Sequence, residues 1–523
     1  MAKVPEWRRI SLEKVLLYAA AAGSAIEAAT LIWYELLRFG HFDLGIDYAN
    51  FNQGTYLISR GLLYPFNTIN NDYFLKDTFG LLSWLLALPR LLFPSGATLL
   101  VEQALAIAAT VFFLVWIAIE QSRRLSPVFR VGVVGTTALF AFANPWALEA
   151  DSFDVHLEPF AALGLVVAVW ALLAGRRRWA VAGVAVALLS GSALIVTALG
   201  LGLGLLFMPR LRREGIWIAG ASLVMLLADE ILRAHQGFSI ATSYGYLAEG
   251  TSANPSILAI LEGAVLRPSL PIAAIVKQWL PITRILGYGG LLGLLFPPTL
   301  FATVLTLPMN ALAQGGEFIS LTQGFQNWPE VALLLAGSAV VAPELLLRLA
   351  GGWRTVVAVA GAALAAATGV GMLLFDATVP FAWIPTPGVA WAPLARTKAA
   401  TPPSAEVAAT INVISRFSAR RDIFPVIGDP ITIPVCRQQA VVVVEVGGGY
   451  AAMTLAQVQA EARGLLAARG ARVLANAGGV VAVDFGNLRP GSQVIELPSG
   501  TVVGGSGAAA IDAARCVGTA AAS

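Results

Sequence analysis

Long apolar runs recur along the first three quarters of the chain and restrict what it can fold into. Many of them extend for about 17–25 residues, which lets a helix cross roughly 30 Å of hydrocarbon. Hydrophobic residues make up 57% of the sequence and charged residues 12%. We therefore predict a polytopic membrane protein whose membrane part is all-α. The net charge of +3 is too small to indicate nucleic acid as a partner.

Basic residues cluster between the apolar runs and indicate which ends of the spans face the cytoplasm. Arg8, Arg9 and Lys14 accompany the start of the first run, residues 14–37. The N-terminus is therefore expected inside, and this run is expected to be an uncleaved first span. Alternating crossings between the clusters give about eleven spans in a cell membrane, with the C-terminal part outside.

The further spans are predicted at 97–119, 131–147, 159–175, 179–208, 215–233, 282–312, 329–349 and 353–375. Two of these runs are expected to be helix pairs. Residues 179–208 start and end at basic clusters, and Pro297-Pro298 interrupts residues 282–312. Prolines and an arginine interrupt residues 79–93, which are expected to form a re-entrant or interfacial helix.

Composition divides the chain into four parts. They are a transmembrane domain at 1–380 with outer loops at 38–78 and 234–281, a Pro-rich linker at 381–395, a small extracytoplasmic α/β domain at 396–486, and a partly mobile Gly/Ala-rich tail at 487–523. In the small domain we expect helices at 404–417 and 454–470, a strand at 441–446 and a hairpin at 472–485.

The two cysteines, Cys436 and Cys516, both lie near the C-terminus and show no zinc or redox spacing. An outer location would permit a disulfide between them. The alternative is two unpaired thiols.

Polar residues gather in segments predicted to face outside. The stretch ADSFDVHLEPF, residues 150–160, places Asp154, His156 and Glu158 just before an apolar run. In an extended segment their spacing puts all three on one side, and in a helix Asp154 and Glu158 share a face. They could bind a divalent cation, orient one another, or act as a base and its orienting partner. The alternative is that they are polar because the loop touches water.

Short motifs along most of the chain resemble an uncharacterised family of polytopic prokaryotic membrane proteins, a domain-of-unknown-function family. IDYANFNQGTYLISRG, residues 46–61, resembles the signature F-D-x-G-x-F-x-Q-x-x-W-x-x-x-x-G through Asp47, Phe51, Gln53, Tyr56 (aromatic in place of Trp) and Gly61. FDVHLEP resembles F-D-F-H-x-E, and Asp77 with residues 92–95 fits a block in which a D-H pair precedes L-F-P-S. The C-terminal domain also looks like the ending of the family.

The family is grouped with the GT-C membrane glycosyltransferases, which carry an acid in the first outer loop and take sugars from polyprenyl-phosphate donors. The resemblance therefore implies that the transmembrane domain at 1–380 is GT-C-like and that Asp47 is the general base. The residues expected to line or support the same cavity are Gln53, Asp77, Asp154, His156 and Glu158. The candidates for the lipid phosphate are Lys76, Arg267, Lys277 and Arg284, each of which could instead be an ordinary interface anchor. Membrane lipids, the lipid-linked sugar and other membrane proteins are the expected partners.

The chain departs from the family pattern at two places. Ser190-Gly191-Ser192 stands where family members often carry Lys-Glu-Asp, and Thr78 stands where His is usual. The alternative to an active glycosyltransferase is a catalytically degenerate relative that serves as a structural or assembly subunit of a membrane complex. A transporter of lipid or solute is a third interpretation, and the scarcity of polar residues in the inner halves of the spans argues against it.

Overall fold

The computed structural model describes residues 11–233, 240–248, 257–313, 317–319, 324–349, 351–372, 374, 386–426, 431–447, 453–504 and 516. The chain forms two compact units. The first, the helical unit, comprises Met1–Ile32, Gln103–Phe153 and Leu157–Trp383. The second, the mixed unit, comprises Trp33–Glu102, Asp154–His156 and Ile384–Ser523.

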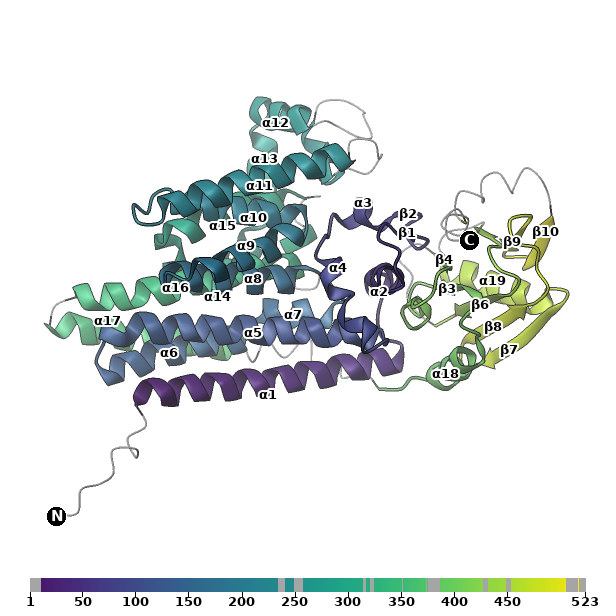
Figure 1. The fold of residues 1–523 in the computed structure, drawn as a ribbon, viewed down its shortest axis with the longest axis horizontal. Coiled ribbons are helices and arrows are strands. Elements are labelled where there is room, and N and C mark those ends of the chain that lie inside the picture. The colour runs from purple at the N-terminus through teal and green to yellow at the C-terminus, as the bar shows by residue number, and fades with distance from the viewer. Residues whose placement is uncertain are drawn as a thin grey trace, which may run out of the picture. The chain divides into compact units, whose positions relative to one another are not determined.

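The helical unit is built from apolar helices (Figure 1). They are α1 (Leu12–His41, whose end belongs to the mixed unit), α5 (Ala97–Gln121, whose start belongs to the mixed unit), α6 (Pro127–Phe142), α7 (Pro145–Ser152), α8 (Glu158–Leu173), α9 (Arg177–Leu189), α10 (Ser192–Leu205), α11 (Arg212–Arg233), α12 (Ile257–Leu266), α13 (Ser269–Lys277), α14 (Trp279–Gly289), α15 (Pro297–Leu312), α16 (Trp328–Arg348) and α17 (Gly351–Gly371).

Glycines let neighbouring helices of this unit approach closely. A Cβ atom on Gly164 of α8 would lie 2.5 Å from the carbonyl oxygen of Gly183 on α9. A Cβ atom on Gly204 of α10 would collide with the backbone at Pro297 and Pro298, where α15 begins. Small residues at such crossings are typical of helices that pack within a bilayer, where backbone approach and van der Waals contact drive association.

Six helices of the described residues are long and apolar enough to cross a membrane, or seven if the bent pair α12 and α13 counts as one span. The predicted number of about eleven is therefore not confirmed. The difference arises from short helices. The predicted hairpin at 179–208 is present as α9 and α10, but α10 has 14 residues. Its length of about 21 Å is less than the hydrocarbon thickness.

Two interrupted regions show different outcomes. The predicted break at Pro297-Pro298 is confirmed, because α14 ends at Gly289 and α15 begins at Pro297. The segment 234–281 was expected to be an outer loop, whereas its described part contains η4 (Ile240–Leu247), α12 and α13. The axes of α12 and α13 meet at 89°. This part of the segment is helical because its apolar side chains recur at helical spacing. The Tyr, Gly and Ser content, on which the expected loop was based, does not prevent the helices.

The mixed unit contains a five-stranded sheet with strand order β4-β3-β6-β8-β7. Its strands are β3 (Glu406–Thr410), β4 (Ile423–Val426), β6 (Ala440–Glu445), β7 (Ala471–Ala477) and β8 (Val480–Phe485). The β3 strand pairs in parallel with β4 and β6, and β8 pairs antiparallel with β6 and β7. The helices α18 (Trp391–Ala400) and α19 (Leu455–Ala467) pack against this sheet.

Three expectations for this region are confirmed, namely the strand at 441–446, the β7–β8 hairpin and the helix α19. Thr454 and Gln457 form a capping box at the start of α19. The helix expected at 404–417 is wrong, because Glu406–Thr410 is the strand β3. Every residue of β3 is buried, so the strand lacks the polar alternation by which a half-exposed strand is recognised.

A second, three-stranded antiparallel sheet has the order β10-β9-β5, with β5 (Ile431–Pro434), β9 (Gln493–Leu497) and β10 (Thr501–Gly504). Two of these strands lie in the segment expected to be a tail. Val494, Ile495 and Leu497 of β9 are buried in a core cluster. Cys436 and Cys516 are joined by a disulfide, with their Cα atoms 5.6 Å apart.

The segment after α1 belongs to the same compact unit as the C-terminal sheet. It forms α2 (Ile46–Ser59), β1 (Phe66–Asn67), β2 (Asp72–Tyr73), α3 (Phe74–Thr78), α4 (Ser83–Leu86) and the 3-10 turn η2 (Pro89–Leu91). Phe42, Ala49 and Ile69 are members of one hydrophobic core with Val407 and Phe417. The first outer loop and the C-terminal domain, expected to be separate, therefore share a core.

Candidate active site

The start of α2 carries the acid that the sequence singled out. The backbone turns after α1 at Phe42, which has a positive φ of 63°, and α2 begins after Gly45. Asp47 lies in the first turn of α2, and 46% of its side chain is exposed. The positive end of a helix favours an ionised carboxylate at this position. Asp47 is thus a solvent-accessible acid at the N-terminus of a largely buried helix.

Asp154 caps this helix from a distant part of the sequence. Its Oδ1 accepts a hydrogen bond of 3.0 Å from the backbone N–H of Gly45, and its Oδ2 accepts one of 3.2 Å from the N–H of Tyr48. Helix N-termini need such acceptors, which the residue before the helix usually provides. Gly45 has no side chain to do so. A Cβ atom there would lie 2.8 Å from Asp154 Oδ2, so glycine leaves the space that the capping carboxylate occupies.

Arg38 balances the buried charge of the cap. Its Nη2 lies 3.9 Å from Asp154 Oδ1, while its Nη1 donates to Glu35 at 2.9 Å and its Nε lies 3.6 Å from Asp43. Burial raises the pKa of Asp154 above its ordinary value, against the opposing effects of Arg38 and of the backbone donors Gly45 and Tyr48. These contacts fix the direction in which α2 leaves the end of α1.

His156 contacts Asp47 directly. Its Nε2 lies 3.8 Å from Asp47 Oδ2, and its ring packs edge-to-face against Phe51. Burial lowers the pKa of His156 to about 3, so the imidazole is neutral at neutral pH. The contact is therefore between a carboxylate and a neutral ring. At this distance a small side-chain adjustment or a bridging water would complete a hydrogen bond.

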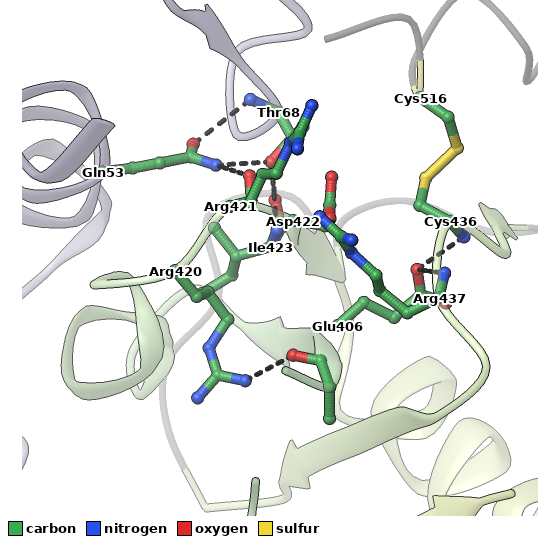
Figure 2. Close-up of polar contacts among 11 residues, drawn as sticks. Gln53, Thr68, Glu406, Arg420, Arg421, Asp422, Ile423, Cys436, Arg437 and Cys516 are labelled. Carbon is green, nitrogen blue, oxygen red and sulfur yellow. Dashed lines mark hydrogen bonds and ion pairs between the residues drawn. A yellow bond between two sulfur atoms is a disulfide. The ribbon is translucent and has the colours of Figure 1, made fainter. Parts of the chain in front are cut away.

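The polar atoms of Gln53 form hydrogen bonds within the protein. The Gln53 Nε2 donates to Thr68 Oγ1 and to the carbonyl of Arg421, each at 2.8 Å, and its Oε1 accepts from Thr68 N at 3.2 Å. Thr68 in turn bonds the backbone of Ile423 in β4 (Figure 2). Gln53 therefore ties α2 to the C-terminal sheet.

The other predicted residues are distributed over both units. Lys76 lies 4.0 Å from Asp72 and 5.3 Å from the ring centroid of Tyr73. The side chain of Asp77 lies outside the described part of the structure. Glu158, Arg267, Lys277 and Arg284 belong to the helical unit.

Within the helical unit, these residues have local roles. Glu158 lies in the first turn of α8, and Arg267 Nη2 donates to the carbonyl of Leu247 at 2.8 Å. Lys277 is exposed in the last turn of α13, and Arg284 is half-buried on α14.

Asp47 and His156 together have the properties of a proton acceptor and its positioning partner. The carboxylate is accessible, and the neutral imidazole lies 3.8 Å from it. Sequence reasoning missed Arg38 and Gly45, because their contribution lies in contacts with Asp154 rather than in a motif. Among the side chains that the structure describes, no group of three or more His, Cys, Asp or Glu could hold a metal ion.

Comparisons with known proteins give one family. The family model described as "Predicted membrane protein (DUF2079)" matches residues 34–431. No curated protein matches the chain. Among solved structures, the crystal structure of ArnT from Cupriavidus metallidurans in the apo state is similar, with 15% sequence identity and a TM-score of 0.42. The alignment covers 88% of this chain and 98% of ArnT.

Proposed function

The chain belongs to the DUF2079 family of predicted membrane proteins, and we propose that it is a membrane glycosyltransferase of the GT-C type. It transfers a sugar from a polyprenyl-phosphate donor to an acceptor hydroxyl at the outer membrane face. The observation that carries the proposal is the contact between Asp47 and His156 at the start of α2, directly after the first span. The resemblance of IDYANFNQGTYLISRG and FDVHLEP to family signatures supports it.

In this reaction Asp47 acts as the general base. Its carboxylate takes the proton of the acceptor hydroxyl while the oxygen of that hydroxyl forms a bond to the anomeric carbon. The bond between the anomeric carbon and the phosphate oxygen breaks, and the polyprenyl phosphate leaves with the electron pair. His156 positions the carboxylate, and Asp154 positions the first turn of α2. His156 does not have to lose a proton before Asp47 acts as the base, because the imidazole is already neutral.

The test is donor turnover by the purified full chain in nanodiscs that contain undecaprenyl-phosphate-linked sugars. We expect the wild type to release undecaprenyl phosphate and Asp47→Asn to reduce this release by about 100-fold or more, as loss of a general base does. Glu496→Gln, which neutralises an exposed carboxylate on β9, is the control and should leave turnover unchanged. Equal turnover by the wild type and Asp47→Asn would refute the role of Asp47.

One observation favours a second function, a non-catalytic subunit of a membrane complex. The turn between α9 and α10, at Ser190-Gly191-Ser192, contains no ionisable side chain, and Ser190 Oγ donates to the carbonyl of Val186 in its own helix at 2.7 Å. This turn therefore has a structural hydroxyl where family members often carry charged residues. A wild-type protein that turns over none of the donors and co-purifies with another membrane protein in a fixed ratio would establish this second function.

A further inference from the structure

A stack of aromatic rings lies at the short hairpin formed by β1 and β2. The rings of Tyr64 and Tyr73 are nearly parallel, at 20°, and their centroids lie 4.4 Å apart. Phe66, the cross-strand partner of Tyr73, packs edge-on against the same ring with the centroids 5.5 Å apart. Tyr73 is therefore the inner ring of the stack, and Tyr64 is the outer ring.

Tyr64 is exposed although one face of its ring is covered. Its stack with Tyr73 covers that face, and 46% of the residue still reaches solvent. Cross-strand aromatic pairs stabilise hairpins, and Phe66 with Tyr73 fills that role here. Tyr64 precedes β1 and takes no part in the strand pairing, so the hairpin does not require its ring. The outward face of Tyr64 is thus a candidate surface for a ligand.

The backbone on both sides of Tyr64 is fixed. The carbonyl of Leu63 accepts a hydrogen bond of 3.0 Å from the indole Nε1 of Trp84. Pro65 has a restricted φ, and its carbonyl accepts a hydrogen bond of 3.0 Å from the N–H of Phe74. A ring held in this way loses little conformational freedom when it binds a ligand, and such preorganisation favours binding.

Two charged side chains lie beside the stack. Lys76 Nζ lies 5.3 Å from the ring centroid of Tyr73 and 4.0 Å from Asp72 Oδ1. Both side chains are partly exposed, and an exposed ion pair of this kind contributes little to stability. The ammonium and the carboxylate can therefore bind polar groups of a ligand at low cost. A lipid chain or an apolar peptide would leave them without partners.

Aromatic contacts connect the stack with the helix that carries Asp47. Phe74 follows Tyr73 directly and packs edge-on against Phe51, with the centroids 5.8 Å apart. Phe51 lies one turn after Asp47 on α2. Phe74 also lies against Gly54, where a Cβ atom would come within 2.7 Å of the ring. Gly54 is about 10 Å from Asp47 along the helix axis, which is comparable with the length of a disaccharide.

We propose that Tyr64, Asp72 and Lys76 bind a pyranose ring of a saccharide. The C–H groups on one face of a pyranose carry partial positive charge, which the negative face of an aromatic ring attracts. The hydroxyl groups at the edge of the pyranose form hydrogen bonds with the Asp72 carboxylate and the Lys76 ammonium. Aromatic surface with a few placed polar groups is the usual composition of a small-molecule site. The bound sugar is a non-reacting unit of the acceptor, and this assignment alone rests on the proposed function.

The experiment measures saccharide binding to the purified full chain in phosphatidylcholine nanodiscs, which contain no sugar-based detergent. The probes are cellobiose, mannobiose and N,N′-diacetylchitobiose, and the method is saturation-transfer difference NMR without any lipid-linked donor. We expect saturable binding of at least one probe, with the strongest transfer to its ring C–H protons. Tyr64→Ala and Tyr64→Leu should each weaken this binding about 10-fold, since both remove the aromatic face. Tyr64→Trp keeps such a face and should bind as the wild type does.

Tyr18→Ala, which removes an exposed tyrosine ring from α1, is the matched control and should leave binding unchanged. Asp72→Asn removes the charge and keeps the shape, and it should weaken binding by a smaller factor than Tyr64→Ala does. Thermal unfolding of each variant shows whether the hairpin remains folded. Tyr64→Leu keeps an apolar side chain, so the test remains valid if Tyr64→Ala is unstable.

The proposal is overturned if none of the probes binds, or if Tyr64→Leu binds a probe as tightly as the wild type does. Its failure is distinguishable from failure of the proposed function. If the wild type turns over the donor but binds no saccharide, the saccharide site is refuted and the proposed function stands. If a saccharide binds through Tyr64 and no donor is turned over, the saccharide site stands and the proposed function is refuted.

Discussion

His156 lies next to Asp47 yet carries no charge at neutral pH, because burial lowers its pKa to about 3. An unfolded histidine titrates near 6.5. Between these values the unfolded state binds more protons than the folded state, so stability falls as the pH falls from 6.5 towards 3. At neutral pH this penalty is absent, and the ring contributes its contacts with Asp47 and Phe51.

We therefore predict that His156→Gln changes how stability depends on pH. The variant loses ring contacts at pH 7.5 but avoids the acid penalty, which for the wild type amounts to ~2 kcal/mol at pH 5. The difference in melting temperature between the two proteins should shrink or reverse from pH 7.5 to pH 5. A constant difference over this range would show that His156 titrates as an exposed histidine does.

The dependence of wild-type activity on pH should also reflect the neutral state of His156. With His156 neutral throughout, the dependence of kcat on pH should show no inflection from this residue between pH 5 and pH 8, and His156→Gln should lower kcat without adding one. An inflection near pH 6.5 that disappears in His156→Gln would assign the proton transfer to the imidazole instead of Asp47.

At the scale of elements, α2 depends on a cap that comes from a different part of the chain. Asp154 accepts from the N–H groups of Gly45 and Tyr48, and the absence of a side chain at Gly45 makes room for it. A helix in this position would slide or fray without an acceptor at its N-terminus. The orientation of Asp47 is thus set by a carboxylate more than one hundred residues away in sequence.

We predict that Gly45→Ala displaces the Asp154 cap and destabilises the protein by about 1–2 kcal/mol, the cost of a lost helix cap. Gly40→Ala is the control, because a Cβ atom at Gly40 would meet no atom within 4 Å. Thermal unfolding of the purified variants measures both effects. Equal melting temperatures for Gly45→Ala and Gly40→Ala would mean that Asp154 does not hold the start of α2.

At the scale of the whole molecule, the oxidation state of the disulfide in cells reports which side of the membrane the C-terminal part faces. Cys436 and Cys516 are 80 residues apart, and the N–H of Cys436 donates to Glu406 Oε2 at 2.6 Å (Figure 2). Closing a loop of this length stabilises the folded chain by up to about 4 kcal/mol in the chain-entropy account. Such bonds persist in oxidising compartments.

We predict that a membrane-impermeant maleimide labels Cys436 and Cys516 in intact cells only after treatment with a reductant. After reduction, added protease should also cleave the C-terminal part faster, because the disulfide no longer constrains it. A Cys436→Ser/Cys516→Ser variant is the control for labelling elsewhere. Labelling without reductant, or labelling only after the membrane is permeabilised, would contradict an oxidised, extracytoplasmic domain.

The sequence by itself determined features that depend on neighbouring residues. Apolar runs long enough for a bilayer indicated the membrane class and the positions of α1, α5 and α16. The amphipathic stretch 454–470 indicated the helix α19, and Gly478-Gly479 indicated the turn between β7 and β8. The fully buried β3 escaped this reasoning, because helix and strand periodicity cannot be distinguished in a short apolar segment.

Only the tertiary structure decided which distant segments meet. Asp47 and His156 are more than one hundred residues apart, and their contact follows from the cap that Asp154 makes on α2. The sequence motifs drew attention to all three residues, but not to the cap. Buried polar groups need hydrogen-bond partners. In the folded protein these partners come from segments far apart in the sequence, so local sequence patterns do not reveal them.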